Sequence, residues 1–524
     1  YVQIAPFDYT ANATTAIDTI QSLIVAFVIA MIFRGFVVEG FVIPTGSMAP
    51  TLLGQHMLID STQTGSSTPV GLDPQAKPDA RQLRDHLAGR LQPFSKGGIE
   101  ASDARMGDRI LVAKWLYPFF SPGRFDVVVF KNPVHPDGPA GTYIKRLVGL
   151  PGETVWIVDG DIFVRQSGDD RFHVTRKDRD VRETVWQLVW DSEQAPTAPA
   201  RLPKGWTGLP WIGSPRSDWR STGHTLESQS TTPATLDWDA SRFPLDDWNA
   251  YNMFTPARGD YPVSDLRVSA TVTPQREGLS ASFDLTARGH VFRFAVTGTT
   301  ASIDMWAKDQ PGDVQHVEAS IADHGAGTPI RIVAEHIDQT ARLLIDHDEV
   351  AELTYDWTPI ERLSYSTGTK NASADELARR LPDPPILQWT FSGAPVQVAN
   401  MQVERDLYYR PATLSANASL KNQPTAEFVQ QVTPGDPAAA THPASLLTLG
   451  PDQFFMLGDN SARSLDGRLW GAPAPIVAEQ IDPTPFVVNR DLLIGKAFVV
   501  YFPAPLSGAG PIPIPDFGRL RFIH

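Results

Sequence analysis

Residues 41–52 read FVIPTGSMAPTL, and the interpretation of the whole chain starts from this stretch. Ser47 follows a glycine in a turn that has a proline on either side. The flexible glycine and the rigid prolines let the amide and the hydroxyl of Ser47 point the same way, as a nucleophile of acyl transfer and its oxyanion donor must. Taken alone, the stretch is also compatible with any exposed loop.

An apolar segment precedes this turn. Residues 17–33, IDTIQSLIVAFVIAMIF, carry a charge only at Asp18, and the next charge is Arg34. A helix of this length spans roughly 25 Å, and the next few residues extend it to about the thickness of a bilayer core. We predict a lead at 1–15 and a single transmembrane anchor at 16–38. A buried core helix and a cleavable signal peptide are the alternatives, but the second lacks a basic segment before its apolar run.

Short β-branched runs bounded by Gly and Pro follow the turn and predict a β-rich core. We place the first part of this core at 39–164, with an insertion at 61–104, and the second part at 451–503, before a Pro- and Gly-rich tail at 504–524. The insertion is polar and has a helical pattern at 80–91. The predicted core strands are 109–112, 126–130, 143–148, 155–158, 453–457 and 493–501.

Residues 165–450 show a different pattern. Seven of the 13 tryptophans lie between Trp186 and Trp248, and regularly spaced alternating strands follow, which predicts an inserted β-sandwich of the jelly-roll type. These strands are 266–272, 280–285, 291–296, 301–306, 330–334, 342–345 and 396–403.

The role of this insert stays open between a structural cap, a glycan-binding module and a partner-binding module. We expect its tryptophans mostly in the core, whereas exposed ones would favour sugar stacking. The two ends of the insert should meet, and we expect it to be dispensable for bond cleavage itself.

The amino-acid composition excludes some kinds of partner and some kinds of catalytic group. The 524 residues are 42% hydrophobic and 20% charged, which fits a folded chain of two or three domains. Lys and Arg number 45 against 59 Asp and Glu, a net charge of −14, so nucleic acid is not an expected partner. Cysteine is absent, so covalent catalysis must use Ser, Thr, Lys or a carboxylate. We expect neither a metal nor a cofactor.

Lys145 interrupts an apolar strand in residues 142–153, TYIKRLVGLPGE. An apolar environment disfavours the charged ammonium and lowers the pKa of a lysine from about 10.4 toward about 7–8, where it can act as a general base. The alternative is a strand lysine whose ammonium reaches water.

Residues 454–471, FFMLGDNSARSLDGRLWG, are dense in polar side chains after an apolar strand, which favours a site. By themselves they are equally compatible with a turn at 458–460 and a surface ion pair between Asp466 and Arg468.

In this order, the anchor and the three segments resemble the conserved boxes of bacterial type I signal peptidases, the membrane-anchored serine peptidases that remove signal peptides from exported proteins. The resemblance covers residues 16–60, 106–164 and 452–503. It implies that Ser47 is the nucleophile, that Lys145 is its general base, and that Thr45 completes an oxyanion hole with the Ser47 amide.

The resemblance also implies supporting roles. Ser464 matches the serine that hydrogen-bonds the catalytic lysine, while Ile43 and Ile144 match positions that line shallow −1 and −3 pockets. Such pockets exclude large side chains and so select Ala-x-Ala. The residues that match the support of the site are Gly458, Asp459, Asn460, Asp466 and Arg468. The chain departs from the family pattern at positions 461, 462, 463 and 467, where it has Ser, Ala, Arg and Gly.

We therefore predict a mainly β protein with signal peptidase I activity, held by one span in the inner (plasma) membrane with its catalytic part on the extracytoplasmic face. The expected partners are signal peptides of exported preproteins and the lipid bilayer, with secretion-machinery proteins as further candidates. The alternative is an anchored cell-envelope binding protein, for glycan or protein, in which the peptidase core is only a scaffold. Such a scaffold has no reason to keep Ser47, Lys145 and Ser464.

Overall fold

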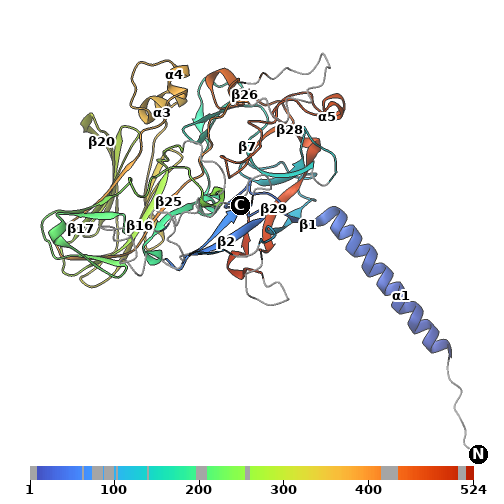
Figure 1. Ribbon diagram of the computed structural model, residues 1–524, viewed down its shortest axis with the longest axis horizontal. Helices are drawn as coiled ribbons and strands as arrows, with labels where there is room; N and C mark the ends of the chain where they lie inside the picture. Colours follow the sequence, from blue (N-terminus) through green and yellow to red (C-terminus); the bar gives the residue numbers. More distant parts are fainter. Residues whose placement is uncertain are drawn as a thin grey trace, which may run out of the picture.

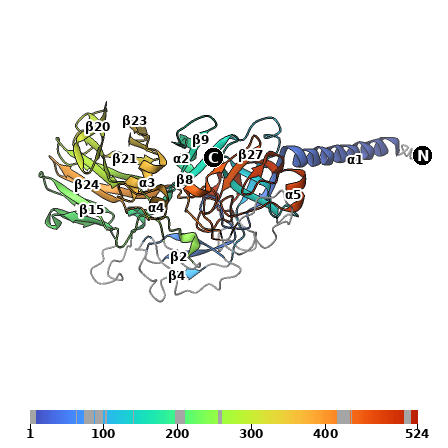
Figure 2. The same ribbon diagram turned by 90° about the horizontal axis from the view of Figure 1, so that it is seen from above.

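The computed structural model describes residues 9–61, 64–72, 87, 99–101, 104–138, 141–195, 209–253, 260–414, 433, 435–504 and 515–524. Within these residues the chain forms an apolar N-terminal helix, a β-rich core and a sandwich of two larger sheets. Figure 1 and Figure 2 show the helix at one end of the molecule and the sandwich at the other, with the core between them. Most of the helical pattern predicted at 80–91, and 505–514 of the predicted tail, lie outside the described residues.

The N-terminal helix α1 (Tyr9–Ile32) continues through a π-helical turn η1 (Phe33–Val37) directly into strand β1 (Val38–Val42). Residues Ile17–Val37 have a mean hydropathy of 2.2 and are long and apolar enough to cross a membrane, and this segment is the one such helix in the described chain. No residue of its apolar window is buried, and Figure 1 shows α1 extending away from the body. A helix that is apolar on every side needs an apolar environment around it.

The core is built on one antiparallel sheet with the strand order β1-β5-β29-β6-β7-β27-β28, and β30 pairs with β29. The strand bounds are Arg109–Ala113 for β5, Val127–Lys131 for β6, Thr142–Gly149 for β7, Gln453–Leu457 for β27, Val488–Asn489 for β28, Leu493–Phe502 for β29 and Arg521–Phe522 for β30. The predicted core strands 109–112, 126–130, 143–148, 453–457 and 493–501 lie within or beside these bounds, whereas 155–158 belongs to a flanking sheet. Because β29 lies between β5 and β6, the parts of the chain before and after the insert complete one sheet together.

Two smaller sheets flank this one. The first, in the order β10-β9-β8-β26, shares a hydrophobic cluster with β27. The second, in the order β3-β2-β4, falls largely within the predicted insertion at 61–104. Their strands are β2 (His56–Ser61), β3 (Ser67–Gly71), β4 (Ile99–Ala101), β8 (Glu153–Val158), β9 (Asp161–Gln166), β10 (His173–Val174) and β26 (Leu447–Thr448).

The inserted segment forms the predicted sandwich. One sheet has the order β13-β14-β25-β16-β21-β22-β23, with β11 also paired to β25, and the other has the order β12-β15-β24-β17-β18-β19-β20. Both sheets contribute to one hydrophobic core, in which Trp190, Trp211, Trp238 and Trp389 are buried, as expected for core tryptophans. The strands are β11 (Gln187–Asp191), β12 (Trp211–Ser214), β13 (Trp219–Thr222), β14 (Thr225–Ser228), β15 (Ala234–Trp238), β16 (Leu266–Pro274), β17 (Ser280–Ala287), β18 (His290–Thr297), β19 (Thr300–Ala307), β20 (Gln310–Ser320), β21 (Ile330–Ile337), β22 (Thr340–Ile345), β23 (Asp348–Thr354), β24 (Ile386–Ser392) and β25 (Val396–Arg405).

The chain enters and leaves the sandwich at one place. Gln187, at the start of β11, lies opposite Arg405, at the end of β25, so the two ends meet. The segments just outside them, including α2 (Arg179–Val185), pack into the same cluster as β8 and β9. The sandwich itself therefore occupies a shorter range than the predicted insertion at 165–450.

Buried ion pairs fix the sandwich to the core. The ammonium of Lys177 lies 2.7 Å from a carboxylate oxygen of Asp338 and 2.7 Å from one of Asp406. Asp161 of β9 pairs at 2.7 Å with Arg362 of helix α3 (Pro359–Ser366). One carboxylate oxygen from each of the three aspartates lies within 4.8 Å of the other two, and the cations beside them are Lys177 and Arg362. Removing one partner of such a pair leaves a buried charge, so the two bodies are held in one arrangement.

Candidate active site

The loop that carries Ser47 runs from the end of β1 to the start of β2. Met48 and Leu52 are fully buried and anchor its two turns in the core. Asp108 holds the far end, because its carboxylate accepts the Leu53 amide at 2.8 Å and its own amide donates to the Leu53 carbonyl at 2.9 Å. Ser47 is left half-buried between these anchors, so its hydroxyl has a fixed position.

Lys145 points at this hydroxyl from strand β7 of the core sheet. It lies on β7, opposite Val128 of β6, and its side chain is buried. The Nζ atom lies 2.6 Å from Oγ of Ser47 and donates to the carbonyl of Ile144 at 3.0 Å. A nucleophile and a base within hydrogen-bond distance are the arrangement that proton transfer requires.

Burial lowers the pKa of Lys145 to about 8, and the nearby carboxylates of Asp466 and Asp459 oppose this shift. Each of those carboxylates has a cation of its own, so its field at Lys145 is partly cancelled. The loss of hydration therefore determines the direction of the pKa shift, which is downward, as the apolar strand around Lys145 predicts.

The partner of Asp459 is Arg146, the residue after the lysine. Its Nε and Nη2 atoms donate to the two carboxylate oxygens at 2.8 and 2.7 Å, and both side chains are fully buried. Thr51, on the nucleophile loop, donates its hydroxyl to the same carboxylate at 2.6 Å. Asp459 thus ties the loop of Ser47 to the strand of Lys145.

Asp466 and Arg468 form a second buried pair, with Nε and Nη2 of Arg468 at 2.9 and 2.8 Å from the carboxylate. Arg468 also donates to the Ser461 hydroxyl at 2.7 Å, and that hydroxyl accepts the Arg410 amide at 2.8 Å. The serine at position 461, a departure from the family pattern, thus accepts hydrogen bonds from the supporting arginine and from the chain that leaves the sandwich. The interpretation of Asp466 and Arg468 as a surface pair does not apply, because both are buried.

Ser464 lies at the site, but it does not make the hydrogen bond to Lys145 that the resemblance implies. Its Oγ is buried and has no hydrogen-bond partner among the described residues. The hydroxyl packs instead against Gly458, where a Cβ would lie 2.1 Å from it and 2.5 Å from the Ser47 carbonyl. Only glycine therefore fits at position 458, because a Cβ atom there would clash with its neighbours.

A cavity of about 1650 Å³ opens in front of Ser47 and Lys145. Thr45 and Ile144, for which roles in an oxyanion hole and a substrate pocket are predicted, both line it. Ile43 is buried in the core beneath the loop and is not among the residues that line this cavity. The amide of Ser47 has no acceptor among the described residues, so this N–H remains available to a ligand.

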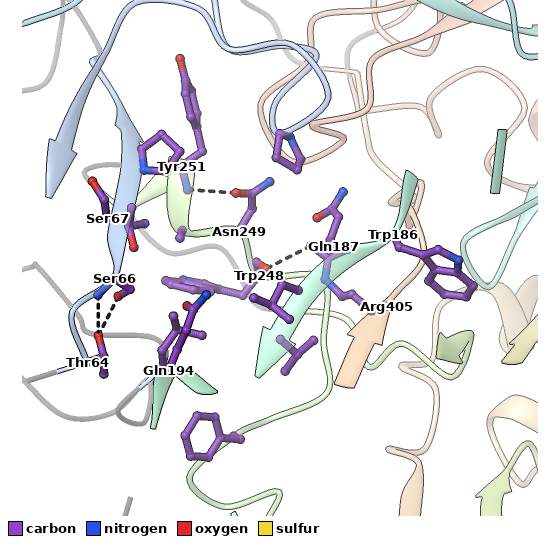
Figure 3. A pocket seen from close by; sticks show the side chains of 18 of the residues that line it. Thr64, Ser66, Ser67, Trp186, Gln187, Gln194, Trp248, Asn249, Tyr251 and Arg405 are labelled. Carbon is purple, nitrogen blue, oxygen red and sulfur yellow. Dashed lines mark hydrogen bonds between the residues drawn. The ribbon is translucent and has the colours of Figure 1, made fainter. Parts of the chain in front are cut away.

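Two residues that line this cavity lie outside all of the sequence motifs described above. Tyr251 and Asn252 belong to a short 3-10 helix, η7 (Ala250–Asn252), in the inserted segment, and both line the cavity of Ser47. Tyr251 also lines a second cavity of about 700 Å³, shown in Figure 3, between the core and the sandwich. Only the folding of the insert brings them near Ser47, about two hundred residues earlier, so local sequence patterns give no sign of them.

Comparison with known proteins agrees with the motifs. The family described as Signal peptidase, peptidase S26 matches residues 16–74 and 92–201, which include Ser47 and Lys145. This part of the chain is therefore similar to the signal peptidase family, and the predicted resemblance to type I signal peptidases is confirmed. The match does not extend to 452–503, where Asp459, Asn460 and Ser464 lie.

Curated relatives named "Signal peptidase I" are similar to part of the chain. One from Rickettsia bellii is 28% identical over 160 residues, which is 30% of this chain and 43% of the relative. One from Pseudomonas aeruginosa is 34% identical over 128 residues, which is 24% of this chain and 30% of the relative. The chain thus covers less than half the length of these relatives.

Among solved structures, carbohydrate binding module CBM66 from Bacillus subtilis is 10% identical, with a TM-score of 0.22, over 36% of this chain and 90% of the module. No conclusion about the sandwich follows from a score of this size.

Proposed function

We propose that this protein is a membrane-anchored serine endopeptidase that removes signal peptides after Ala-x-Ala, with Ser47 and Lys145 as a catalytic dyad. The observation that carries the proposal is the 2.6 Å distance between Ser47 Oγ and Lys145 Nζ at the wall of a large cavity. The family match supports the substrate class. An anchored binding protein would need no buried lysine against a loop serine, so this alternative is not favoured.

The proposed reaction has two halves. Neutral Lys145 takes the proton of the Ser47 hydroxyl as Oγ attacks the scissile carbonyl, and the Ser47 amide and the Thr45 hydroxyl stabilise the oxyanion. The resulting ammonium gives its proton to the leaving amine, which becomes the N-terminus of the mature protein. Water then attacks the acyl-enzyme while Lys145 takes its proton. Lys145 passes this proton to Oγ of Ser47 as the ester bond breaks, and the signal peptide leaves with a new C-terminal carboxyl group.

The direct test is cleavage of a preprotein by the purified full chain in detergent. We expect one new N-terminus, directly after Ala-x-Ala, by mass spectrometry, and no such product when the −1 residue is changed to a bulky one. Cleavage at other sites, or none under conditions in which the chain is folded, would refute the proposed function.

The rate should depend on pH in one direction. Since only the neutral lysine can accept a proton and the pKa of Lys145 is about 8, kcat should rise as the pH increases through about 8 and then level off. Below that pH each unit should cost about tenfold, because the neutral fraction falls tenfold. The measurement is a kcat profile between pH 6 and pH 10 on a peptide without titrating groups in that range; a rate that falls with rising pH would contradict Lys145 as the base.

The orientation in the membrane can be checked separately. We expect the body after residue 38 on the extracytoplasmic face, because signal-peptide cleavage sites emerge there. In sealed inverted vesicles the body should be protected from added protease, and detergent should expose it. Digestion of the body in intact inverted vesicles would contradict this topology.

A further inference from the structure

The inserted segment reaches the nucleophile loop through its η7 helix. The amides of Asn252 and Asn460 pair reciprocally, with Nδ2 of Asn252 at 2.7 Å from Oδ1 of Asn460 and Nδ2 of Asn460 at 2.8 Å from Oδ1 of Asn252. Asn460 follows β27, within the core, whereas Asn252 comes from the insert. This amide pair is therefore a direct polar contact between the insert and the catalytic segment.

Asn460 in turn holds the two carbonyls around Ser47. Its Nδ2 donates to the Gly46 carbonyl at 2.9 Å, and its backbone amide donates to the Ser47 carbonyl at 3.1 Å. The Gly46 carbonyl also accepts the Ala49 amide at 3.1 Å inside the turn. Because a trans peptide unit is planar, the Gly46 carbonyl and the Ser47 N–H point in opposite directions, so fixing one fixes the other.

Tyr251 covers the same turn from the side. A Cβ at Gly46 would lie 2.0 Å from Cε1 of Tyr251, and a Cβ at Gly71 would lie 2.1 Å from the same atom. The ring is wedged between these two glycines, and its hydroxyl donates to the Gln55 carbonyl at 3.0 Å. The turn that carries Ser47 cannot shift toward the insert while this ring is in place.

The η7 helix is itself held by the sandwich. Asn249 caps it by accepting the Tyr251 amide at 2.9 Å, and Arg405, at the end of β25, donates to the carbonyls of Trp248 and Asp247 at 3.1 and 3.3 Å. Figure 3 shows Asn249 with Tyr251 and Arg405 beside Trp248 along one wall of the smaller cavity. A continuous set of contacts thus joins the last strand of the sandwich to the Ser47 loop.

We propose that Asn252 is a positioning residue for the oxyanion donor: through Asn460 it fixes the Gly46–Ser47 peptide so that the Ser47 N–H faces the developing oxyanion. The inference rests on the proposed function, since it requires Ser47 to be the nucleophile. It gives the insert a part in catalysis, in contrast to the expectation that bond cleavage does not need it. Asn252 touches neither the substrate nor the reacting atoms in this role.

The test is the kinetics of Asn252→Ala in the full-length protein on an Ala-x-Ala peptide. Loss of a whole oxyanion donor costs about 10²- to 10³-fold in kcat, so loss of one of the contacts that orient it should cost about 10- to 100-fold. KM should change less than kcat and the pH midpoint should not move, because Ile144 and Lys145 are not changed. Gln315→Ala, which removes an exposed amide from β20 of the same insert, is the matched control and should keep the wild-type kcat.

A double-variant cycle tests the route through Asn460. If Asn252 acts through Asn460, the Asn252→Ala and Asn460→Ala double variant should lose no more kcat than Asn460→Ala alone, whereas independent effects would multiply. Asn252→Asp keeps the size and an acceptor for Asn460 Nδ2, so its kcat should lie between those of Asn252→Ala and wild type. This variant also keeps the test valid if Asn252→Ala unfolds.

The outcomes are distinct. A wild-type kcat for Asn252→Ala, multiplied losses in the double variant, or a raised KM with unchanged kcat would overturn the positioning role while leaving the dyad intact. Cleavage that persists in Ser47→Ala would overturn the proposed function, and the positioning role with it. A loss in kcat alone for Asn252→Ala, with a double variant no slower than Asn460→Ala alone, supports the inference.

Discussion

Ser47→Ala and Lys145→Met should each lower kcat for an Ala-x-Ala preprotein by about 10⁴-fold or more. Alanine removes the only atom that forms the acyl-enzyme. Methionine fills the buried site of the lysine with an apolar side chain of similar length but cannot accept the Ser47 proton across the 2.6 Å contact. Cleavage is measured under single-turnover conditions, so that a slow residual rate is still detected.

Both variants should remain folded. Lys145 is buried mainly against its own strand and the Ser47 hydroxyl, so a buried apolar replacement removes a desolvated amine and leaves no charge unpaired. The double variant should be no slower than either single one, because the two groups act as a unit. Substantial cleavage by either single variant would show that the nucleophile or the base has been assigned wrongly.

Arg146→Met should destabilise the folded protein by about 3–5 kcal/mol, since it leaves the Asp459 carboxylate buried with no cation. The same change removes the guanidinium donors to the carbonyls of Phe125 and His524, at 2.9 and 2.8 Å. The free energy of unfolding is obtained from urea titration of the purified wild type and variant. If this free energy falls with urea concentration at the same slope in both proteins, a change of the denatured state is excluded.

Arg379→Met is the matched control. Arg379 pairs at 3.0 Å with Asp375 one helical turn away, and the two side chains are 71% and 49% exposed. Exposed pairs of this kind contribute about 0.5 kcal/mol or less. A loss below about 1 kcal/mol for Arg146→Met, similar to that of the control, would mean that the buried pair does not stabilise the site.

Ser47 and Lys145 could each be singled out in the sequence because each lies in a short segment whose chemistry is local, but their pairing was expected only from the resemblance to type I signal peptidases. Ser47 follows a glycine in a turn bounded by prolines, and Lys145 interrupts a strand that is otherwise apolar; both features can be seen within a dozen residues. The core strands could be predicted from their short β-branched runs, and seven of the fifteen sandwich strands from alternation with a period of two.

Other features depend on contacts that no local pattern records. Strand β20 was not predicted, because nearly all its side chains are exposed and it has no apolar face to mark it. The amide pair of Asn252 and Asn460 joins residues about two hundred positions apart through the folding of the sandwich. The hydrogen bond expected from Ser464 is absent because Gly458 and the loop of Ser47 enclose its hydroxyl.

The wall formed by Tyr251 and Asn252 has a consequence for selective inhibition. Both residues lie outside the ranges 16–74 and 92–201 that match signal peptidases, yet they line the cavity of Ser47. An electrophilic group that acylates Ser47 meets residues shared with the family, whereas a substituent directed toward the sandwich meets a surface that the family match does not include. Compounds that discriminate between this protein and the signal peptidases that it resembles should therefore be extended toward Asn252.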